Sequence, residues 1–263
     1  MKIFTYNILT SCRAQLEYPK TFVIGVMSQW LGYGVQFATI WILVRKFGNL
    51  SGWSPDEVLL LYGFQLLSYG IAALFLANTL DLLPQLIRTG DFDVILTKPI
   101  NSLDYLATMN FNIGYVGHIT LSVTLISICW YRMGIALTFS NLFYLICLVI
   151  GGSLITGATL LISLIPSLIW VGENQLPQII FNLRSFINNP IPLYSNAIQF
   201  FLTFILPYGF INFYTVQHFL NRQEGAFSFF AIPNFSIIIG IILLFVSRNL
   251  WRVAVNYYQS TGS

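Results

Sequence analysis

Charged side chains are scarce in this chain. Asp, Glu, Lys and Arg make up only 8% of its 263 residues, whereas 56% of the residues are hydrophobic. A soluble domain carries about 25% charged residues. The low share of charge therefore excludes an ordinary soluble domain and favours a chain whose surroundings are the lipid bilayer. The net charge of +3 is too small to indicate nucleic acid, and we expect no such partner.

Motifs for nucleotide, metal and redox chemistry are also missing. No G-x-x-x-x-G-K-[ST] pattern occurs and no Gly is followed by Lys, so the chain has no phosphate-binding loop of its own. It has no H-E-x-x-H and no C-x-x-C spacing, which argues against a metal or redox centre. The three cysteines (Cys12, Cys129, Cys147) are an odd, scattered set, and we expect reduced thiols. We therefore predict no catalytic residues, no metal site and no cofactor bound by this chain.

Long stretches free of Asp, Glu, Lys and Arg are abundant instead. Six of them have about 23 residues or more, enough to cross a hydrocarbon core of roughly 30 Å. We predict an all-α integral membrane protein, a single transmembrane domain over residues 1–263. Its six transmembrane helices are expected at 21–44, 56–80, 104–130, 142–165, 193–214 and 230–248, with Pro207 kinking the fifth.

Two further segments have apolar residues at helical spacing but cannot be regular spans. Residues 1–20 are predicted to form an N-terminal interfacial helix, and a frayed tail is the alternative. About 20 polar-interrupted residues before the first apolar run do not predict a signal peptide. Residues 174–192 contain three prolines and are predicted to form another helix that lies on the membrane surface.

The stretch between the second and third predicted spans is polar. It contains six ionisable residues: Asp81, Arg88, Asp91, Asp93, Lys98 and Asp104. Placing all six at the centre of a bilayer would cost on the order of 15–20 kcal/mol, at roughly 2.5–3.5 kcal/mol each. The stretch must therefore lie in water or against another protein.

A short helix is predicted inside this polar stretch. Gly90 is expected to end the incoming helix, and Asp91 to cap a new one over residues 92–96. Lys98-Pro99 is expected to stop it, since proline lacks the N–H and restricts the residue before it. Its apolar side would consist of Phe92, Ile95 and Leu96.

The distribution of basic residues predicts the orientation. Six spans place both termini on one side of the membrane. That side receives Lys2, Arg13, Lys20, Arg88, Lys98, Arg184, Arg248 and Arg252, and the other receives Arg45, Lys46, Arg132 and Arg222. Because Lys and Arg concentrate in cytoplasmic loops, we expect both termini and the polar stretch in the cytoplasm.

Neutral polar side chains are the candidates for a substrate path. No Asp, Glu, Lys or Arg interrupts the six apolar runs, whereas an ion-coupled carrier normally needs an intramembrane carboxylate. His118 is either a proton relay or substrate contact, or a neutral imidazole bonded to a neighbouring helix, which we favour. The other candidates, Gln65, Asn78, Gln199 and Asn212, either line the path or form interhelical hydrogen bonds.

Three stretches together resemble one family. In Ile87–Leu103, the residues Arg88, Gly90, Asp93, Leu96 and Pro99 form the pattern R-x-G-x-x-D followed by L-x-x-P. This pattern is similar to the loop after the second span in six-span bacterial type-two ABC exporter permeases. Asn189–Val216 resembles the fifth span of that family, although Thr215 stands where the family often has Pro. Trp251–Ser263 is similar to its tail, and with Gln15–Tyr18 the resemblance covers essentially the whole chain.

The resemblance implies a membrane subunit without an ATPase of its own. It would pair with a second permease copy or a related permease in the bacterial plasma (inner) membrane. Two separate ABC ATP-binding subunits, carrying ATP and Mg, would dock from the cytoplasm onto a coupling helix within residues 88–99. The residues implied in coupling are Arg88, Gly90, Asp91, Phe92, Asp93, Ile95, Leu96, Lys98 and Pro99.

Two other functions are compatible with the sequence. An ion-coupled secondary carrier or channel would act without an ATPase, through His118 and the polar residues in the spans. A membrane scaffold or a membrane-embedded enzyme is the third reading, against which the lack of an acid/base or metal constellation argues. The sequence does not identify the cargo.

Overall fold

The computed structural model describes residues 2–47, 52–170, 174–222, 224–230 and 234–260. All regular elements in this part of the chain are helices, so the all-α prediction is confirmed there. The long helices are α2 (Pro19–Phe47), α3 (Pro55–Thr89), α6 (Val116–Arg132), α7 (Phe139–Ile169) and α11 (Asn234–Tyr257). The short helices are α1 (Lys2–Leu16), α4 (Asp91–Leu96), α5 (Ser102–Met109), α8 (Leu176–Leu183), α9 (Asn196–Phe200) and α10 (Phe213–Phe219).

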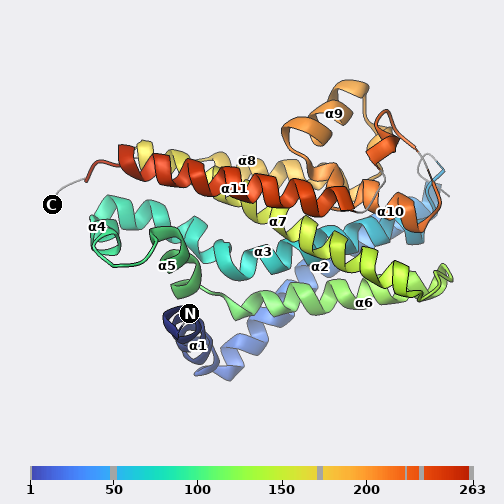
Figure 1. Cartoon of the computed structure of the whole chain (residues 1–263). Coiled ribbons are helices and arrows are strands. Elements are labelled where there is room, and N and C mark those ends of the chain that lie inside the picture. The colour runs from blue at the N-terminus through green and yellow to red at the C-terminus, as the bar shows by residue number, and fades with distance from the viewer. Residues whose placement is uncertain (1, 48–51, 171–173, 223, 231–233, 261–263) are drawn as a thin grey trace.

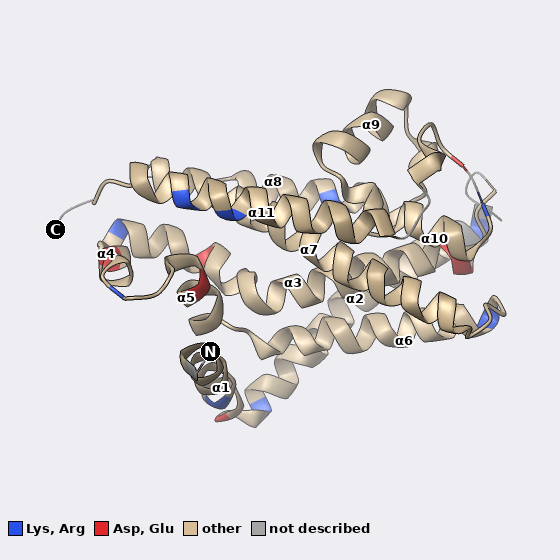
Figure 2. Cartoon of the chain, viewed as in Figure 1, with Lys and Arg blue, Asp and Glu red and all other residues tan. Residues whose placement is uncertain are grey.

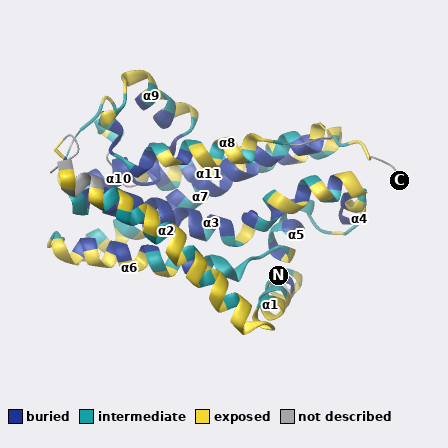
Figure 3. Ribbon diagram, turned by 180° about the vertical axis from the view of Figure 1, so that it is seen from behind, coloured by how far each residue is buried: buried dark blue, intermediate teal, exposed yellow. Residues whose placement is uncertain are grey.

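Helix α3 is the centre of the bundle. It packs against α6 on one side and α7 on the other, and α7 in turn packs against α11. Both ends of the chain lie at the end of the bundle that carries α4 and α5 (Figure 1). Figure 2 shows that charged residues gather toward the two ends. Figure 3 shows α3 mostly buried, whereas α2, α6 and α11 present exposed faces.

Four helical segments are long and apolar enough to cross a membrane. They are Pro55–Thr89, Ile113–Arg132, Phe139–Ile169 and Asn234–Tyr257. A fifth crossing is formed if Asn196–Ile205 and Tyr208–Phe219, which meet at 77°, count as one broken span. Helix α2 has 29 residues but is not among the candidates. Length and composition thus support four to five of the six predicted spans. The first predicted span, 21–44, which corresponds to α2, stays a prediction.

The sequence around α3 explains its exact bounds. Ser54 and Glu57 form a capping box, in which each side chain accepts a hydrogen bond from the other residue's backbone N–H, and Pro55 occupies the first helical position. At the other end, Gly90 adopts φ +77°, a left-handed conformation that terminates the helix as predicted. The helix continues beyond the predicted end of the second span at residue 80. The first nine residues of the polar stretch, 81–89, therefore belong to α3.

The predicted third span, 104–130, is broken. Its first part is α5, and the segment that qualifies as a span begins only at Ile113. At the break, the Asn112 backbone N–H donates to the Leu74 carbonyl over 2.8 Å, and the Asn112 side chain caps the turn that follows. Because asparagine satisfies backbone groups with its own side chain, it favours a break over a continuous helix.

Residues 174–219 also depart from prediction. The expected surface-lying segment 174–192 contains α8, but the 3-10 turn Arg184–Asn188 that follows packs against α3 and buries Ile187. The expected span 193–214 bends sharply around Pro207, where the chain between the two arms is extended at Leu206. Proline removes a backbone donor, so the predicted kink is confirmed and is large enough to break the helix.

Candidate functional site

Helix α4 is the short helix that the sequence predicts after α3. Asp91 is its first residue and does not cap it, which corrects the prediction: Gly90 occupies the cap position without a side-chain hydrogen bond. The Asp91 carboxylate instead accepts a 2.6 Å hydrogen bond from the Thr89 hydroxyl. Beyond the helix, the Lys98 ammonium lies 4.9 Å above the Tyr105 ring, and Pro99 is exposed. Arg88, on the last turn of α3, is exposed.

The apolar face of α4 points largely into the protein itself. Phe92 is completely buried, and Ile95 is buried beside it in the cluster that α3, α5, α7 and α11 share. Of the predicted apolar side, only Leu96 reaches the surface, at 37% exposure, and Val94, which the prediction did not include, is 59% exposed. The accessible apolar groups of α4 are therefore Val94 and Leu96.

A hollow of about 300 Å³ adjoins these exposed residues. It lies between α3, α4 and α5, and its lining includes Leu82, Asp91, Val94, Lys98 and Tyr105. The surface formed by Val94, Leu96 and this hollow is referred to below as the α4 surface. It combines apolar groups with one carboxylate and one ammonium group.

Residues 258–260, which follow α11, contact α4 at Phe92 and Asp93. The ring of Tyr258 packs edge-on against Phe92, with ring centroids 5.0 Å apart, and the Ser260 hydroxyl donates to the Asp93 carboxylate. Burial, followed by the neighbouring Asp93 carboxylate, raises the pKa of Tyr258 to about 12. The phenol therefore stays neutral beside Asp93 at physiological pH. The resemblance of the tail to a family ending gave the only signal in the sequence for this contact.

Loss of the Tyr258 ring is expected to loosen α4. Aromatic pairs of this kind contribute about 0.5–1.5 kcal/mol beyond area burial, so Tyr258→Ala should raise amide hydrogen exchange over residues 91–96 by roughly twofold to tenfold. Tyr258→Phe keeps the ring and serves as the control. Equal exchange in Tyr258→Ala and the natural chain would show that the tail does not support α4.

Helix α1 is tied to the break between α5 and α6. The Gln15 amide donates to the Phe111 carbonyl over 2.6 Å, and its oxygen accepts from the Ile113 backbone N–H over 3.0 Å. The Ser11 hydroxyl also donates to the Met109 carbonyl over 2.7 Å. The outer side of α1 leaves apolar residues such as Tyr6 and Leu9 exposed, as an interfacial helix would. Gln15 thus satisfies backbone groups that the broken helix leaves free.

Replacing Gln15 by Leu is expected to destabilise this junction. The substitution strands one backbone acceptor and one backbone donor, which should lower the free energy of unfolding by about 1–3 kcal/mol. Gln85→Leu, at an exposed position on α3, is the matched control. Thermal unfolding of the purified variants measures the difference, and equal midpoints would contradict the expectation.

Most predicted path residues have structural hydrogen bonds and do not gather at one place. Asn78 accepts from the Asn112 amide over 2.9 Å, and Gln199 bonds the Tyr194 carbonyl and the Ala226 N–H. The Asn212 amide donates to the carbonyls of Leu61 and Ile187. Gln65 is buried on α3. For Asn78, Gln199 and Asn212, these contacts favour a structural role over the lining of a substrate path.

His118 has the neighbouring-helix hydrogen bond that the sequence analysis favours. Its Nδ1 lies 2.8 Å from the Gln29 side-chain oxygen on α2. The ring packs against Tyr33, Tyr69 and Tyr115, with centroids 4.3, 5.7 and 4.8 Å away, while the buried Nε2 has no hydrogen-bond partner among the described residues. His118 therefore belongs to an aromatic cluster in the interior.

Arg184 lies in the interior and not at the membrane surface where the sequence predicts it. It follows α8 and was counted with the cytoplasmic basic residues, but it is 6% exposed and lies over the ring of Tyr69 in α3, 3.6 Å from the ring centroid. Tyr69 is 14 residues from the start of α3 and 20 from its end, or about 21 and 30 Å along the axis. The guanidinium therefore sits deep in the bundle. Without Arg184, seven basic residues against four still favour the predicted orientation.

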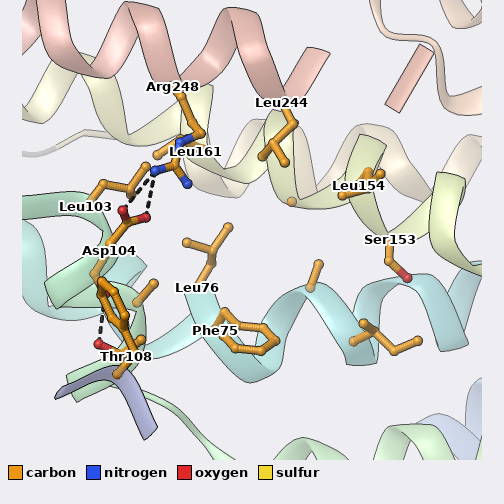
Figure 4. A pocket seen from close by; sticks show the side chains of 15 residues that line it. Phe75, Leu76, Leu103, Asp104, Thr108, Ser153, Leu154, Leu161, Leu244 and Arg248 are labelled. Atoms are coloured by element: carbon orange, nitrogen blue, oxygen red, sulfur yellow. Dashed lines mark hydrogen bonds and ion pairs between the residues drawn. The ribbon is translucent and has the colours of Figure 1, made fainter. Parts of the chain in front are cut away.

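A larger, apolar groove opens elsewhere on the bundle. Its volume is about 520 Å³, and α3, α5, α7 and α11 line it with side chains such as Phe75, Leu76 and Leu244 (Figure 4). The charges at one end are already paired, because an Arg248 nitrogen lies 2.8 Å from an Asp104 carboxylate oxygen. This groove offers apolar surface and no free charge among its lining residues.

These features define a class of protein. The spans of the bundle leave apolar faces exposed, and its charges lie mainly at the two ends, so the chain is a multi-pass membrane protein. Residues 31–262 match the family described as ABC-2 family transporter protein. That match covers most of the chain, and the chain belongs to this family of ABC transporter membrane proteins. No curated protein and no solved structure matches it.

Proposed function

We propose that the chain is the transmembrane permease subunit of an ATP-driven exporter. Family membership supports a transporter membrane component, and the chain has no phosphate-binding loop, so ATP and Mg would be held by separate ATP-binding subunits. Two such subunits would dock on a pair of permeases, formed by a second copy or a related chain. The assembly would lie in a bacterial plasma membrane with both termini in the cytoplasm, as the excess of basic residues on that side favours.

The α4 surface is the observation that carries this proposal. It lies at the end of the bundle that also carries both termini, and it exposes Val94 and Leu96 beside a hollow. Gly90 sets the direction of α4, and Phe92 with Ile95 fastens it to α3, α5, α7 and α11. A helix that is anchored inward and apolar outward suits transmission of force from a docked subunit to the spans.

The residues proposed to contact the ATPase differ from those that the sequence predicts. Phe92 and Ile95 anchor α4 within the permease and are not free to enter a groove on the ATPase. Val94 and Leu96 would enter that groove, and Asp91, Arg88 and Lys98 would pair with its charges. Closure of the two ATP-binding subunits on ATP would then move the α4 helices and switch the permeases between inward-open and outward-open arrangements as rigid bodies.

Reconstitution tests the proposal directly. The chain is co-expressed with a candidate ABC ATP-binding subunit from the same genome, purified through a tag on the permease and placed in proteoliposomes. We expect the two proteins to co-purify and transport to require ATP. Transport by the chain alone under an ion gradient would establish the ion-coupled carrier instead, and failure of the two proteins to associate would contradict the proposal.

A further inference from the structure

Arg184 is a buried cation, and no acidic residue in the described part of the chain forms an ion pair with it. Its Nε and Nη1 atoms are buried and have no hydrogen-bond partner, and it forms no ion pair within the described residues. Two rings flank the guanidinium, with its carbon 3.6 Å from the Tyr69 centroid and 4.7 Å from the Phe181 centroid. Buried polar groups are normally hydrogen-bonded, and buried charges are normally paired. Unused donors on a permanently charged group therefore point to a ligand.

A cleft reaches the rings that flank this guanidinium. Its volume is about 340 Å³, and its lining includes Tyr69 and Phe181 together with Asp81, Tyr115, Asn174 and Gln178. This volume lies within the range of small-molecule sites, roughly 300–1,000 Å³. Arg184 does not itself line the cleft, so a ligand would reach it past the Phe181 ring, which is 38% exposed and would have to change rotamer.

Asp81 is too far away to neutralise Arg184. The two cleft residues Tyr69 and Asp81 are 12 positions apart on α3, which corresponds to about 18 Å along the helix. Across that distance the two side chains cannot form a contact ion pair, which requires a nitrogen–oxygen distance of about 4 Å or less. Asp81 therefore lies toward the end of α3 that carries α4, and Arg184 keeps its positive charge available.

We propose that Arg184 binds the anionic group, a carboxylate or a phosphate, of an amphiphilic molecule whose apolar or aromatic body occupies the cleft beside Tyr69 and Phe181. The planar fork of a guanidinium matches the two oxygens of such groups, and the aromatic walls suit an apolar body. His118, packed against Tyr69 with its Nε2 unbonded, adds a second polar atom to the same cluster. The assignment of this site as the cargo site rests on the proposed exporter function. The binding of an anionic group at Arg184 does not depend on that function.

A matched pair of probes tests the charge requirement. The purified full chain in a neutral maltoside detergent, without any ATP-binding subunit, is titrated with 9-anthracenecarboxylic acid and with its methyl ester, and binding is followed by fluorescence anisotropy. The natural chain is expected to prefer the acid by at least about tenfold, the size of one charge-assisted hydrogen bond. Arg184→Met should abolish this preference, while Arg252→Met, at an exposed position on α11, should keep it.

The readouts separate binding from folding and from transport. Loss of preference in Arg184→Met with an unchanged melting temperature supports the site. An equal preference in Arg184→Met and the natural chain, or none in the natural chain, overturns it. If Arg184→Met does not fold, Arg184→Lys serves as the test variant, because it keeps the positive charge but lacks the planar guanidinium. An undiminished preference for the acid probe in Arg184→Lys would overturn the bidentate site. Because the assay contains no ATP-binding subunit, its result is independent of the exporter proposal.

Competition identifies the source of the anionic group. Displacement of the acid probe by benzoate or inorganic phosphate supports a ligand that arrives from water. Displacement by phosphatidic acid alone supports a membrane lipid. Displacement by none of them, with the acid preference intact also in Arg184→Met, contradicts binding at Arg184.

Discussion

The double variant Val94→Asp/Leu96→Asp is expected to abolish association with the ATP-binding subunit while the permease stays folded. Both side chains are exposed on α4, so their replacement costs little stability, within about 0.5 kcal/mol for ordinary surface positions. In the complex, two carboxylates would enter an apolar groove. A loss of at least 2 kcal/mol at such positions corresponds to about thirtyfold weaker binding. Co-purification through a permease tag measures the loss.

Two comparisons make this result specific to α4. Leu137→Asp places the same charge at a 74% exposed apolar position between α6 and α7, toward the opposite end of the bundle, and should leave association unchanged. Phe92→Asp, by contrast, would bury a carboxylate in the core and is expected to unfold the region. Normal association of the double variant would remove α4 from the coupling interface.

The second large effect is expected at Gly151, where α7 and α11 cross. A side-chain carbon added there would overlap the Ser236 carbonyl carbon and lie 2.5 Å from the Ile237 backbone nitrogen. On α11, a carbon added at Gly240 would lie 2.9 Å from the Gly151 carbonyl oxygen. Backbone atoms cannot turn away as a side chain can, so Gly151→Val must separate the two helices. We expect a loss of about 3 kcal/mol or more.

Thermal unfolding and limited proteolysis of α11 measure this separation. Gly25→Val is the matched control, since a carbon added at Gly25 on α2 meets no atom within 4 Å. We expect the control to keep the natural melting temperature and Gly151→Val to expose α11 to protease. Equal stability of the two variants would contradict the close crossing seen between α7 and α11.

Strong local signals in the sequence predicted the corresponding helices and helix ends correctly. Residues 58–80 and 234–247, which belong to two of the long apolar stretches, are helical throughout, and the Thr-Gly-Asp sequence at 89–91 marks the turn from α3 into α4. The end of α3 at Gly90 was predictable because only glycine readily adopts the left-handed conformation that ends this helix. The bend at Pro207 was predictable for a related reason, the missing backbone donor.

Errors arose where a residue's partner lies far away in the sequence. The sequence placed Phe92 on a docking face, but it packs against Tyr258, 166 positions later. The break at Asn110–Asn112 is supported by Gln15 and by the Leu74 carbonyl, which no local pattern reveals. Arg184 was expected at the cytoplasmic surface because it lies in residues 174–192, which the sequence predicts to form a helix on the membrane surface. A local periodicity can show that a face is apolar without showing what covers it.

The sequence by itself determined that this is a helical membrane chain without its own nucleotide site, and it predicted where the central helix ends. These properties depend on composition, on hydrophobic runs and on single residues such as Gly90 that act on their own backbone. Only the tertiary structure decided which side of α4 is accessible and that Arg184 lies beside Tyr69, without an ion pair to any other residue that the structure describes. Burial and pairing depend on contacts between distant segments, and those contacts exist only once the helices have packed.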